Sequence, residues 1–188
     1  MIDLSKLTAE LHEAAVEKGF WAVGNAESRH IAKMHCELSE AVQEDRCGRP
    51  LLYVDDIEVD ARITDPAMFG GRKPEGVAAE LADFVMMALD YMAHAGVDFD
   101  EEAGDVFAEC YTDPELREEV KDRDLCDVVN VLHSTVVEAD EDGDISALIG
   151  SILAICAWLE IRGCDLWEVI RLKMEYNKSR PALHGRLY

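Results

Sequence analysis

The chain has 188 residues, of which 40 are Asp or Glu and 18 are Lys or Arg, so its formal net charge is −22. This charge argues against a nucleic-acid-binding surface, which needs clustered Lys and Arg to replace counterions, and it equally disfavours contact with anionic membranes. A hydrophobic content of 49% is ample for a packed core, and the length suits one domain or two small ones.

Apolar residues recur at helical spacing through most of the chain and predict an all-α fold. The predicted helices span residues 3–18, 28–46, 75–95, 114–138, 144–162 and 165–178. Three of them are expected to end at a glycine, namely Gly19, Gly96 and Gly163. Segment 47–76 is rich in Pro and Gly and contains two short β-like runs, which predicts an irregular insertion or a small hairpin.

Three further features concern the compartment. The N-terminus, MIDLSKLTAELHEAA, has the pattern of an acidic amphipathic helix and not of a signal peptide. The uncharged stretch ISALIGSILAICAWL (145–159) is shorter than the ~20 residues of a bilayer span, so it predicts a helix buried on all sides. The six cysteines, at positions 36, 47, 110, 126, 156 and 164, form no Cys-x-x-Cys pair and mostly lie in apolar helical runs. We therefore expect a cytoplasmic protein with reduced thiols.

Two pairs of acids lie three residues apart on neighbouring predicted helices. Glu37 and Glu40 belong to KMHCELSEAVQEDR (33–46), with Glu44 on the same stripe, and Glu80 and Asp83 belong to KPEGVAAELADFVMMALDYM (73–92). The two acids of each pair are about 60° apart around their helix and border an apolar seam. Packing the two seams together therefore brings four carboxylates to one edge of the contact.

Such a cluster repels itself and needs cations. Oxygen ligands without Cys or His suit Mg²⁺, or Mn²⁺, better than zinc. In so acidic a chain, a solvated acidic face with no ligand is the alternative interpretation.

Two parts of the chain echo each other. MHCELSEA (34–41) is similar to LHSTVVEA (132–139), and 88–99 aligns with 154–166 on a Gly-x-Asp. In this frame the second copy lacks three of the four acids; the aligned residues are His35 with His133, Glu37 with Thr135, Glu40 with Glu138, Glu80 with Ala147 and Asp83 with Gly150. Duplication and chance both produce such echoes. Duplication predicts two halves, 1–112 and 113–188, packed as a pseudo-dimer or as one compact domain, with metal in the first half only.

Four motifs carry a family resemblance: EKGFW (17–21), HCELSEAVQEDR (35–46), KPEGVAAELAD (73–83) and KMEYNKSRPALHG (173–185). In this order they resemble the motifs of small MazG-like proteins. These belong to the all-α nucleoside triphosphate pyrophosphohydrolase superfamily, which includes the dimeric dUTPases and phosphoribosyl-ATP pyrophosphatase. In this chain the last motif follows the degenerate second copy instead of the first, and the loop over 47–72 is longer than the family pattern.

The resemblance implies a helical bundle of MazG-like type that hydrolyses a nucleoside triphosphate to monophosphate and pyrophosphate. It implies that Glu37, Glu40, Glu80 and Asp83 bind Mg²⁺. We assign the orientation or deprotonation of the attacking water to Glu40, as the catalytic residue. The resemblance also implies that nucleotide is contacted by residues of the last motif, namely Lys173, Tyr176, Asn177 and Arg180.

The residues of the last motif suit this role by themselves. Lys173, Asn177 and Arg180 lie at i, i+4 and i+7 on one helix face, and Lys with Arg suits phosphate oxygens. Five of the 18 basic residues fall between positions 171 and 186, although cations near a helix C-terminus also simply complement its dipole. Lys73 either reaches phosphate or only opens its helix, and Trp21 either stacks on a base or anchors the core.

The specificity for base and sugar stays open among dUTP, dCTP, damaged nucleotides and phosphoribosyl nucleotides. A non-catalytic regulatory protein that binds nucleotide or Mg²⁺ is the alternative from another class, and an acidic helical adaptor is a third. The expected partner is a nucleoside triphosphate, with no nucleic acid and no membrane. The chain either acts alone as a pseudo-dimer or pairs again as a homodimer.

Overall fold

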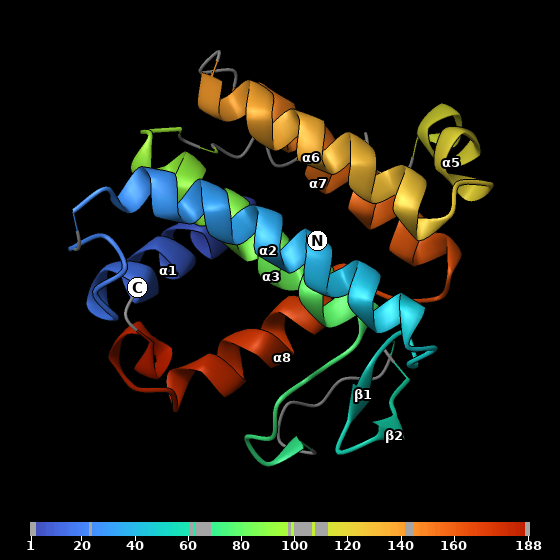
Figure 1. The fold of residues 1–188 in the computed structure, drawn as a ribbon, viewed down its shortest axis with the longest axis horizontal. Coiled ribbons are helices and arrows are strands. Elements are labelled where there is room, and N and C mark those ends of the chain that lie inside the picture. The colour runs from blue at the N-terminus through green and yellow to red at the C-terminus, as the bar shows by residue number, and fades with distance from the viewer. Residues whose placement is uncertain are drawn as a thin grey trace.

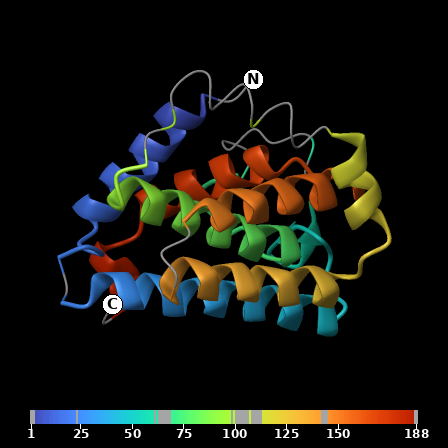
Figure 2. The same cartoon turned by 90° about the horizontal axis from the view of Figure 1, so that it is seen from above.

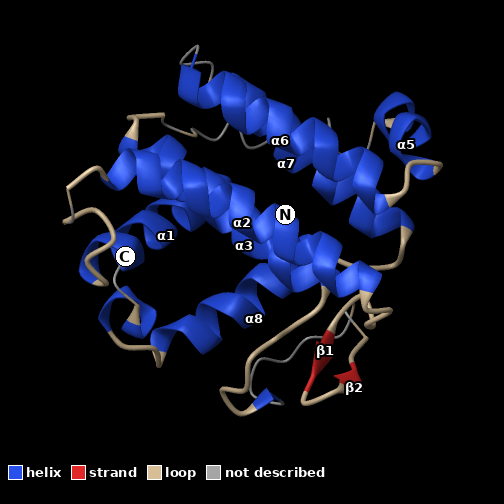
Figure 3. Cartoon of the chain, viewed as in Figure 1, coloured by secondary structure: helices blue, strands red, loops and turns tan. Residues whose placement is uncertain are grey.

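The computed structural model describes residues 3–22, 24–60, 62, 69–97, 99, 107, 113–141 and 145–186. The described chain is mostly helical, which confirms the all-α prediction (Figures 1 and 3). Its helices are α1 (Leu4–Glu17), α2 (Ala26–Arg46), α3 (Val77–His94), α5 (Pro114–Lys121), α6 (Leu125–Glu141), α7 (Ser146–Ile161), α8 (Leu166–Lys178) and the 3₁₀ helix η2 (Ala182–Gly185). A short hairpin of β1 (Tyr53–Val54) and β2 (Ile57–Glu58) completes the described elements.

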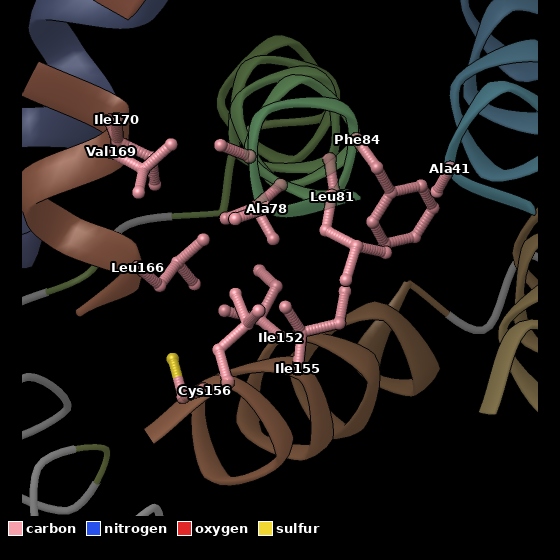
Figure 4. Close-up of a cluster of buried hydrophobic side chains, with 14 of the residues drawn as sticks. Ala41, Ala78, Leu81, Phe84, Ile152, Ile155, Cys156, Leu166, Val169 and Ile170 are labelled. Atoms are coloured by element: carbon pink, nitrogen blue, oxygen red, sulfur yellow. The ribbon is translucent and has the colours of Figure 1, made fainter. Parts of the chain in front are cut away.

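Helix α3 is the centre of the core. It contacts α1, α2, α7 and α8, and 12 of its 18 residues are buried, including the acids Glu80 and Asp90. Figure 4 shows its side chains between those of three other helices; the labelled residues are Ala78, Leu81 and Phe84 of α3, Ala41 of α2, Ile152, Ile155 and Cys156 of α7, and Leu166, Val169 and Ile170 of α8. Two acids of the candidate site, Glu80 and Asp83, therefore lie on a helix that is fixed by packing from several directions.

The helix ends follow local sequence signals. Asp3 caps α1 by accepting from the backbone N–H of Lys6 at 2.9 Å, and Asp165 caps α8 by accepting from that of Trp167, also at 2.9 Å. The three glycines predicted to end helices have φ values of 84°, 84° and 80°, in the left-handed region that glycine adopts without strain. Five of the six predicted helices begin and end within two residues of the observed helix bounds.

The single helix predicted over 114–138 is wrong, because the structure has α5 and α6 there with a break at 122–124. The carbonyl oxygen of Arg123 accepts from the indole Nε1 of Trp158 at 3.1 Å and from Nη2 of Arg162 at 2.9 Å, both on the α7 side of the contact. Asp124 accepts from the backbone N–H of Asp127 at 2.8 Å and begins α6. Tertiary hydrogen bonds thus interrupt a helical pattern that continues in the sequence.

The two β-like runs of segment 47–76 form the hairpin, which lies against the start of α3. Tyr53 exchanges both backbone hydrogen bonds with Glu75 at 2.9 Å. Gly76, at φ 106°, follows directly, and a Cβ there would lie 2.7 Å from the carbonyl oxygens of Pro50 and Leu51. Only glycine fits this approach, so the hairpin position relative to α3 is set by the chain itself.

The five cysteines that the structure describes are divided between the surface and the core. Cys36, Cys47 and Cys126 are exposed, while Cys156 and Cys164 are buried, and all five are free thiols; Cys110 lies outside the described residues. Cys36 is on the face of α2 opposite the buried Met34 and Leu38. In the described chain no single helix is long and apolar enough to cross a membrane; α7 with α8 passes that test only as a pair bent by 105°.

The two predicted halves interlock in the structure. Helices α2 and α6 lie side by side (Figure 2), and α8, from the second half, packs on α3 of the first. His35 of α2 meets His133 of α6, with their Nδ1 atoms 2.7 Å apart and their rings stacked at 5.0 Å. These are the two histidines that the internal echo aligns.

This histidine pair predicts a loss of stability in acid. Burial, with the neighbouring His35 as a second cause, lowers the pKa of His133 below 6.5. The unfolded chain therefore binds more protons than the folded one, and the free energy of unfolding falls as the pH drops below about 6.5. We expect His133→Asn to remove part of this acid loss while leaving stability at pH 8 little changed, as measured by urea unfolding at both pH values. An unchanged pH dependence in His133→Asn would contradict the assignment.

Candidate metal centre

Helices α2 and α3 run antiparallel and bring three of the four predicted metal ligands together. One carboxylate oxygen each of Glu37, Glu40 and Glu80 lies within 4.8 Å of the others. At the opposite end of the helix pair, Nε2 of His94 lies 3.5 Å from Oε1 of Glu27, which fixes the antiparallel direction. The predicted packing of the two acidic seams therefore holds for these three residues.

In this cluster, burial and the repulsion among the carboxylates outweigh the positive charge of Lys173. Burial, together with the neighbouring carboxylates Asp83, Glu80 and Glu40, raises the pKa of Glu37 to about 8, against the lowering effect of Lys173. Burial also raises the pKa of Glu80, against the lowering effect of Lys173. Three oxygen donors at this spacing, one of them buried, fit a hard divalent cation such as Mg²⁺ or Mn²⁺.

Asp83 takes a different partner from the other three acids. Its Oδ2 lies 2.5 Å from Nζ of Lys173, whose side chain is only 2% exposed, against 24% for that of Asp83. Burial alone would lower the pKa of Lys173, but Asp83 and Glu80 raise it above its ordinary value. The ammonium group of Lys173 thus lies at the edge of the acid cluster as a built-in cation.

Two more lysines lie near the acids. Nζ of Lys73 is 3.4 Å from Oε1 of Glu75, and its charge lowers the pKa of Glu80, so it belongs to the surroundings of the cluster. Lys33 was not predicted from the sequence; its pKa is lowered by burial despite the charges of Glu37 and Asp83, and its Nζ lies 4.2 Å from the ring centroid of Phe20. Lys33 lies four residues before Glu37 on α2, and this spacing is the sequence signal that could have identified Lys33 as a neighbour of the acids.

The other predicted nucleotide contacts lie towards the C-terminal end of α8 and just after it; they are Tyr176, Asn177 and Arg180. Nη1 of Arg180 donates to Oδ1 of Asn177 at 3.3 Å, and its guanidinium carbon lies 5.6 Å from the ring centroid of Tyr176. The backbone carbonyl of Arg180 accepts from Nζ of Lys18, which ties the C-terminal segment to the end of α1. At 1.5 Å per residue these groups lie roughly 5–10 Å beyond Lys173 along the helix.

Trp21 lies in another cluster, at the far end of α3. Its Nε1 donates to Asp90 at 3.0 Å, and its ring is stacked on that of His30 at 4.0 Å and on that of His94 at 3.7 Å. Nδ1 of His12 and Nε2 of His30 also lie on the Asp90 carboxylate, at 2.7 and 2.9 Å. Because imidazoles cover both faces of the indole, a nucleotide base would have to displace one of them to stack there.

Glu44 bonds to the hairpin and is not one of the three acids that meet in the cluster. Its Oε2 accepts from the hydroxyl of Tyr53 at 2.9 Å. Burial and this contact raise the pKa of Tyr53 to about 12, so the phenol stays a donor at every physiological pH. The bond holds the hairpin against α2 beside the acid cluster, and no sequence motif signalled it.

The acid cluster predicts a pH-dependent stability in the absence of metal. The pKa of Glu37 rises from 4.5 in the unfolded chain to about 8 in the folded one, so the folded state binds more protons. Its stability contribution is complete below about pH 4.5 and is lost as the pH rises through 8. We expect thermal unfolding in EDTA to show this loss between pH 5 and pH 9, and Mg²⁺ to raise Tm most at the alkaline end. An Mg²⁺ effect that is equal at both ends would contradict the site.

Chemically, this arrangement can bind a divalent cation through three carboxylates and place a buried ammonium group beside it. A second set of polar groups, on the last turns of α8, lies along the same helix. Comparisons of the chain with family models, with curated proteins and with solved structures found no match.

Proposed function

We propose that the chain is an Mg²⁺-dependent nucleoside triphosphate pyrophosphohydrolase of MazG-like type, which converts an NTP or dNTP and water to the monophosphate and pyrophosphate. The observation that carries the proposal is the meeting of Glu37, Glu40 and Glu80 within 4.8 Å, beside the buried Lys173. These four residues come from three helices and belong to three of the motifs that resemble the family. The all-α fold and the hydrophobic packing of α2 on α3 support the same assignment.

In the proposed reaction, a water oxygen bonds to the α-phosphorus, the bond from that phosphorus to the bridging oxygen breaks, and pyrophosphate leaves with the electron pair. Glu40, the exposed member of the cluster, accepts the proton that the water gives up. Bound Mg²⁺ supplies positive charge that neutralises phosphate oxygens. Lys173 exchanges Asp83 for an oxygen of the pyrophosphate and stabilises its developing charge.

The other residues of the proposal hold the nucleotide. Arg180 and Lys73 bind phosphate oxygens, and Tyr176 and Asn177 contact the nucleoside. Asp83 keeps Lys173 oriented before the substrate arrives, and would be free to help hold Mg²⁺ when Lys173 binds pyrophosphate. The stacking of a base on Trp21 stays a prediction, and it requires that one of the two imidazoles on the indole turns away.

The test is a panel assay of the purified protein with Mg²⁺ against common and modified NTPs and dNTPs, with monophosphate and pyrophosphate measured separately. We expect equimolar monophosphate and pyrophosphate from at least one substrate. Release of inorganic phosphate without pyrophosphate would contradict the reaction, because the bond broken would then be a different one.

The Lys173–Asp83 pair favours one second candidate, a non-catalytic regulatory protein that binds nucleotide or Mg²⁺. The pair leaves three acids for metal and neutralises the fourth with the protein's own cation. In this case nucleotide and Mg²⁺ bind, as calorimetry can measure, and the panel gives no product from any substrate.

The internal echo enters the proposal as a duplication. The contact between His35 and His133 supports it, since equivalent residues meet at a two-fold axis. In this arrangement the second half, whose copy of the acidic pairs is lost, supplies α6 and α7 as the packing partner of α2 and α3, and α8 as the carrier of Lys173. Light scattering then distinguishes a monomeric pseudo-dimer from a further homodimer.

A further inference from the structure

Four basic residues gather around one histidine near the C-terminus, where η2 lies beside the end of α1 (Figure 1). The histidine is His184, and burial together with the charges of these residues lowers its pKa to about 4. The four residues form what we call the cation cluster; they are Lys18, Lys33, Arg180 and Arg186. Because the imidazole stays neutral at physiological pH, it offers this positive charge no counterion.

Direct contacts join the cation cluster to the histidine and to the C-terminal segment. Nζ of Lys33 lies 4.2 Å from the centroid of the Phe20 ring, and the ring of His184 meets the same phenyl ring edge-on at 5.1 Å. Nζ of Lys18 donates to the backbone carbonyl of Arg180. The cluster therefore connects the end of α1, helix α2 and the residues that follow α8.

The segment that carries the histidine has a strained backbone. Leu183 and His184 have φ values of 48° and 51°, in the left-handed region that residues with a Cβ rarely adopt. The backbone N–H of Leu183 donates to the carbonyl of Lys18 at 2.9 Å and fixes the segment against the end of α1. Backbone strain of this kind is concentrated at ligand-binding and catalytic sites.

The cation cluster forms no ion pair with a carboxylate among the described residues. All seven lysines of the chain are described, and five of them pair with an Asp or Glu; these are Lys6, Lys73, Lys121, Lys173 and Lys178. The two that do not are Lys18 and Lys33, and both belong to the cluster. Since the chain has 40 acids and 18 bases, the missing partners do not reflect a shortage of carboxylates.

Leaving these cations unpaired costs free energy. Lys18, Lys33 and Arg180 are half-buried, and Arg186 is exposed. Burial lowers the pKa of Lys33, and the charge of Arg186 acts in the same direction, against the carboxylates that lie further away. An anion bound among the four would offset both the desolvation and the mutual repulsion.

The chemistry of the cation cluster identifies the ligand class. Lysine and arginine bind phosphate oxygens, the first as a point charge and the second through its planar fork. One phosphate group carries about two negative charges at neutral pH, so four cations exceed it and match two linked phosphates. A chain of net charge −22 repels anions at long range, which favours a ligand that makes several short contacts.

We infer that Lys18, Lys33, Arg180 and Arg186 form a binding site for a diphosphate group, either free pyrophosphate or the two distal phosphates of a nucleotide. Lys33 precedes Glu37 by four residues, or roughly 6 Å along α2, so the site adjoins the acid cluster. As a site for free pyrophosphate it is independent of the proposed function. As a site for distal phosphates it rests on that function and adds three residues to the phosphate contacts.

The first measurement is a calorimetric titration of the whole protein with inorganic pyrophosphate in EDTA, so that no metal contributes. We expect saturable binding that is at least about tenfold tighter than that of inorganic phosphate, and about tenfold weaker in Lys18→Gln and in Lys33→Gln. The matched control is Lys6→Gln, which removes the same charge from a lysine that pairs with Glu10. It should weaken binding less than about twofold. Equal effects of the three substitutions, or binding no tighter than that of phosphate, would overturn the inference.

The second measurement needs no variant and follows the ring of His184 by NMR. Its pKa of about 4 should rise towards 6.5 at saturating pyrophosphate, because the anion offsets the positive charges that lower it. The ring of His133, on α6, is the internal control and should titrate alike with and without pyrophosphate. A pKa of His184 that pyrophosphate leaves unchanged would equally overturn the inference.

A competition experiment distinguishes the two sources of the diphosphate. The competitor is a nucleoside triphosphate analogue with a methylene bridge between its α- and β-phosphates, which cannot be hydrolysed at that bond. Displacement of pyrophosphate by the analogue assigns the site to the distal phosphates, and a failure to displace it assigns the site to free pyrophosphate. Equal displacement by the nucleoside monophosphate would exclude a diphosphate site. Pyrophosphate binding without any product in the substrate panel would contradict the proposed function and leave this inference in place.

Discussion

Replacing Glu37 by Gln should reduce pyrophosphate release by at least about 100-fold and at the same time stabilise the metal-free protein. The carboxylate is one of three oxygen ligands within 4.8 Å, and disturbing even an outer partner of a metal ligand commonly costs 10–100-fold. The same carboxylate has a pKa raised to about 8 by burial and by its acidic neighbours, so its charge costs free energy in the folded state. The amide keeps the shape and removes that charge.

The stabilisation of Glu37→Gln should depend on pH. At pH 9 in EDTA we expect an increase in the free energy of unfolding on the order of a few kcal/mol, and at pH 5, where the wild-type carboxyl is protonated, little change. Glu138→Gln is the matched control, since Glu138 is exposed on α6 and aligns with Glu40 in the internal echo. It should alter neither activity nor the pH profile. A Glu37→Gln variant that keeps activity, or that is less stable at pH 9, would exclude the metal cluster.

Breaking the Lys173–Asp83 pair from either side should destabilise the fold, and more so from the side of Lys173. Removing one partner of a buried ion pair commonly costs about 3–5 kcal/mol, because the other charge stays buried. In Asp83→Asn the ammonium group of Lys173 keeps the carboxylates of Glu80 and Glu37 as opposite charges. In Lys173→Met the cluster loses the cation that lowers the pKa of Glu37 and of Glu80 and that pairs with Asp83. Urea unfolding should therefore rank Lys173→Met below Asp83→Asn.

The double variant Asp83→Asn with Lys173→Met should be more stable than the sum of the two single changes predicts, since it leaves neither charge unpaired. Lys178→Met is the control on the same helix: Nζ of Lys178 lies 2.6 Å from Glu175, but the side chain is 71% exposed. Its loss should cost less than about 1 kcal/mol. Additive effects of Asp83→Asn and Lys173→Met would show that the two groups are not paired in solution.

The acid cluster was predictable because it depends on the period of a helix. Apolar residues at helical spacing fix the direction in which Glu37 and Glu40 point from α2 and Glu80 points from α3. Packing the two apolar seams against each other then brings the three carboxylates together. The direction in which Asp83 turns was not predictable in this way. Its partner, Lys173, is 90 residues later in the chain (173 − 83), on a helix whose docking against α3 is a tertiary event.

The cluster of side chains around Asp90 was even less predictable from the sequence. It joins His12, Trp21, His30 and Asp90, which come from three helices and a turn, and no two of them form a motif with a recognisable spacing. The break between α5 and α6 likewise depends on Trp158 of α7 and on Arg162 just after it, which both donate to the carbonyl of Arg123. Helical periodicity describes one element at a time, so contacts among several elements lie beyond it.

The central position of α3 has a consequence for the dynamics of both polar sites. Its backbone amides are covered by four other helices, so they should exchange with solvent deuterium only when the whole molecule unfolds. Glu80 and Asp90 therefore belong to the slowest-exchanging segment, and the backbone that carries them should stay in place until the molecule unfolds. Adaptation to differently shaped ligands at the acid cluster then has to come from its other surroundings, the hairpin and α8.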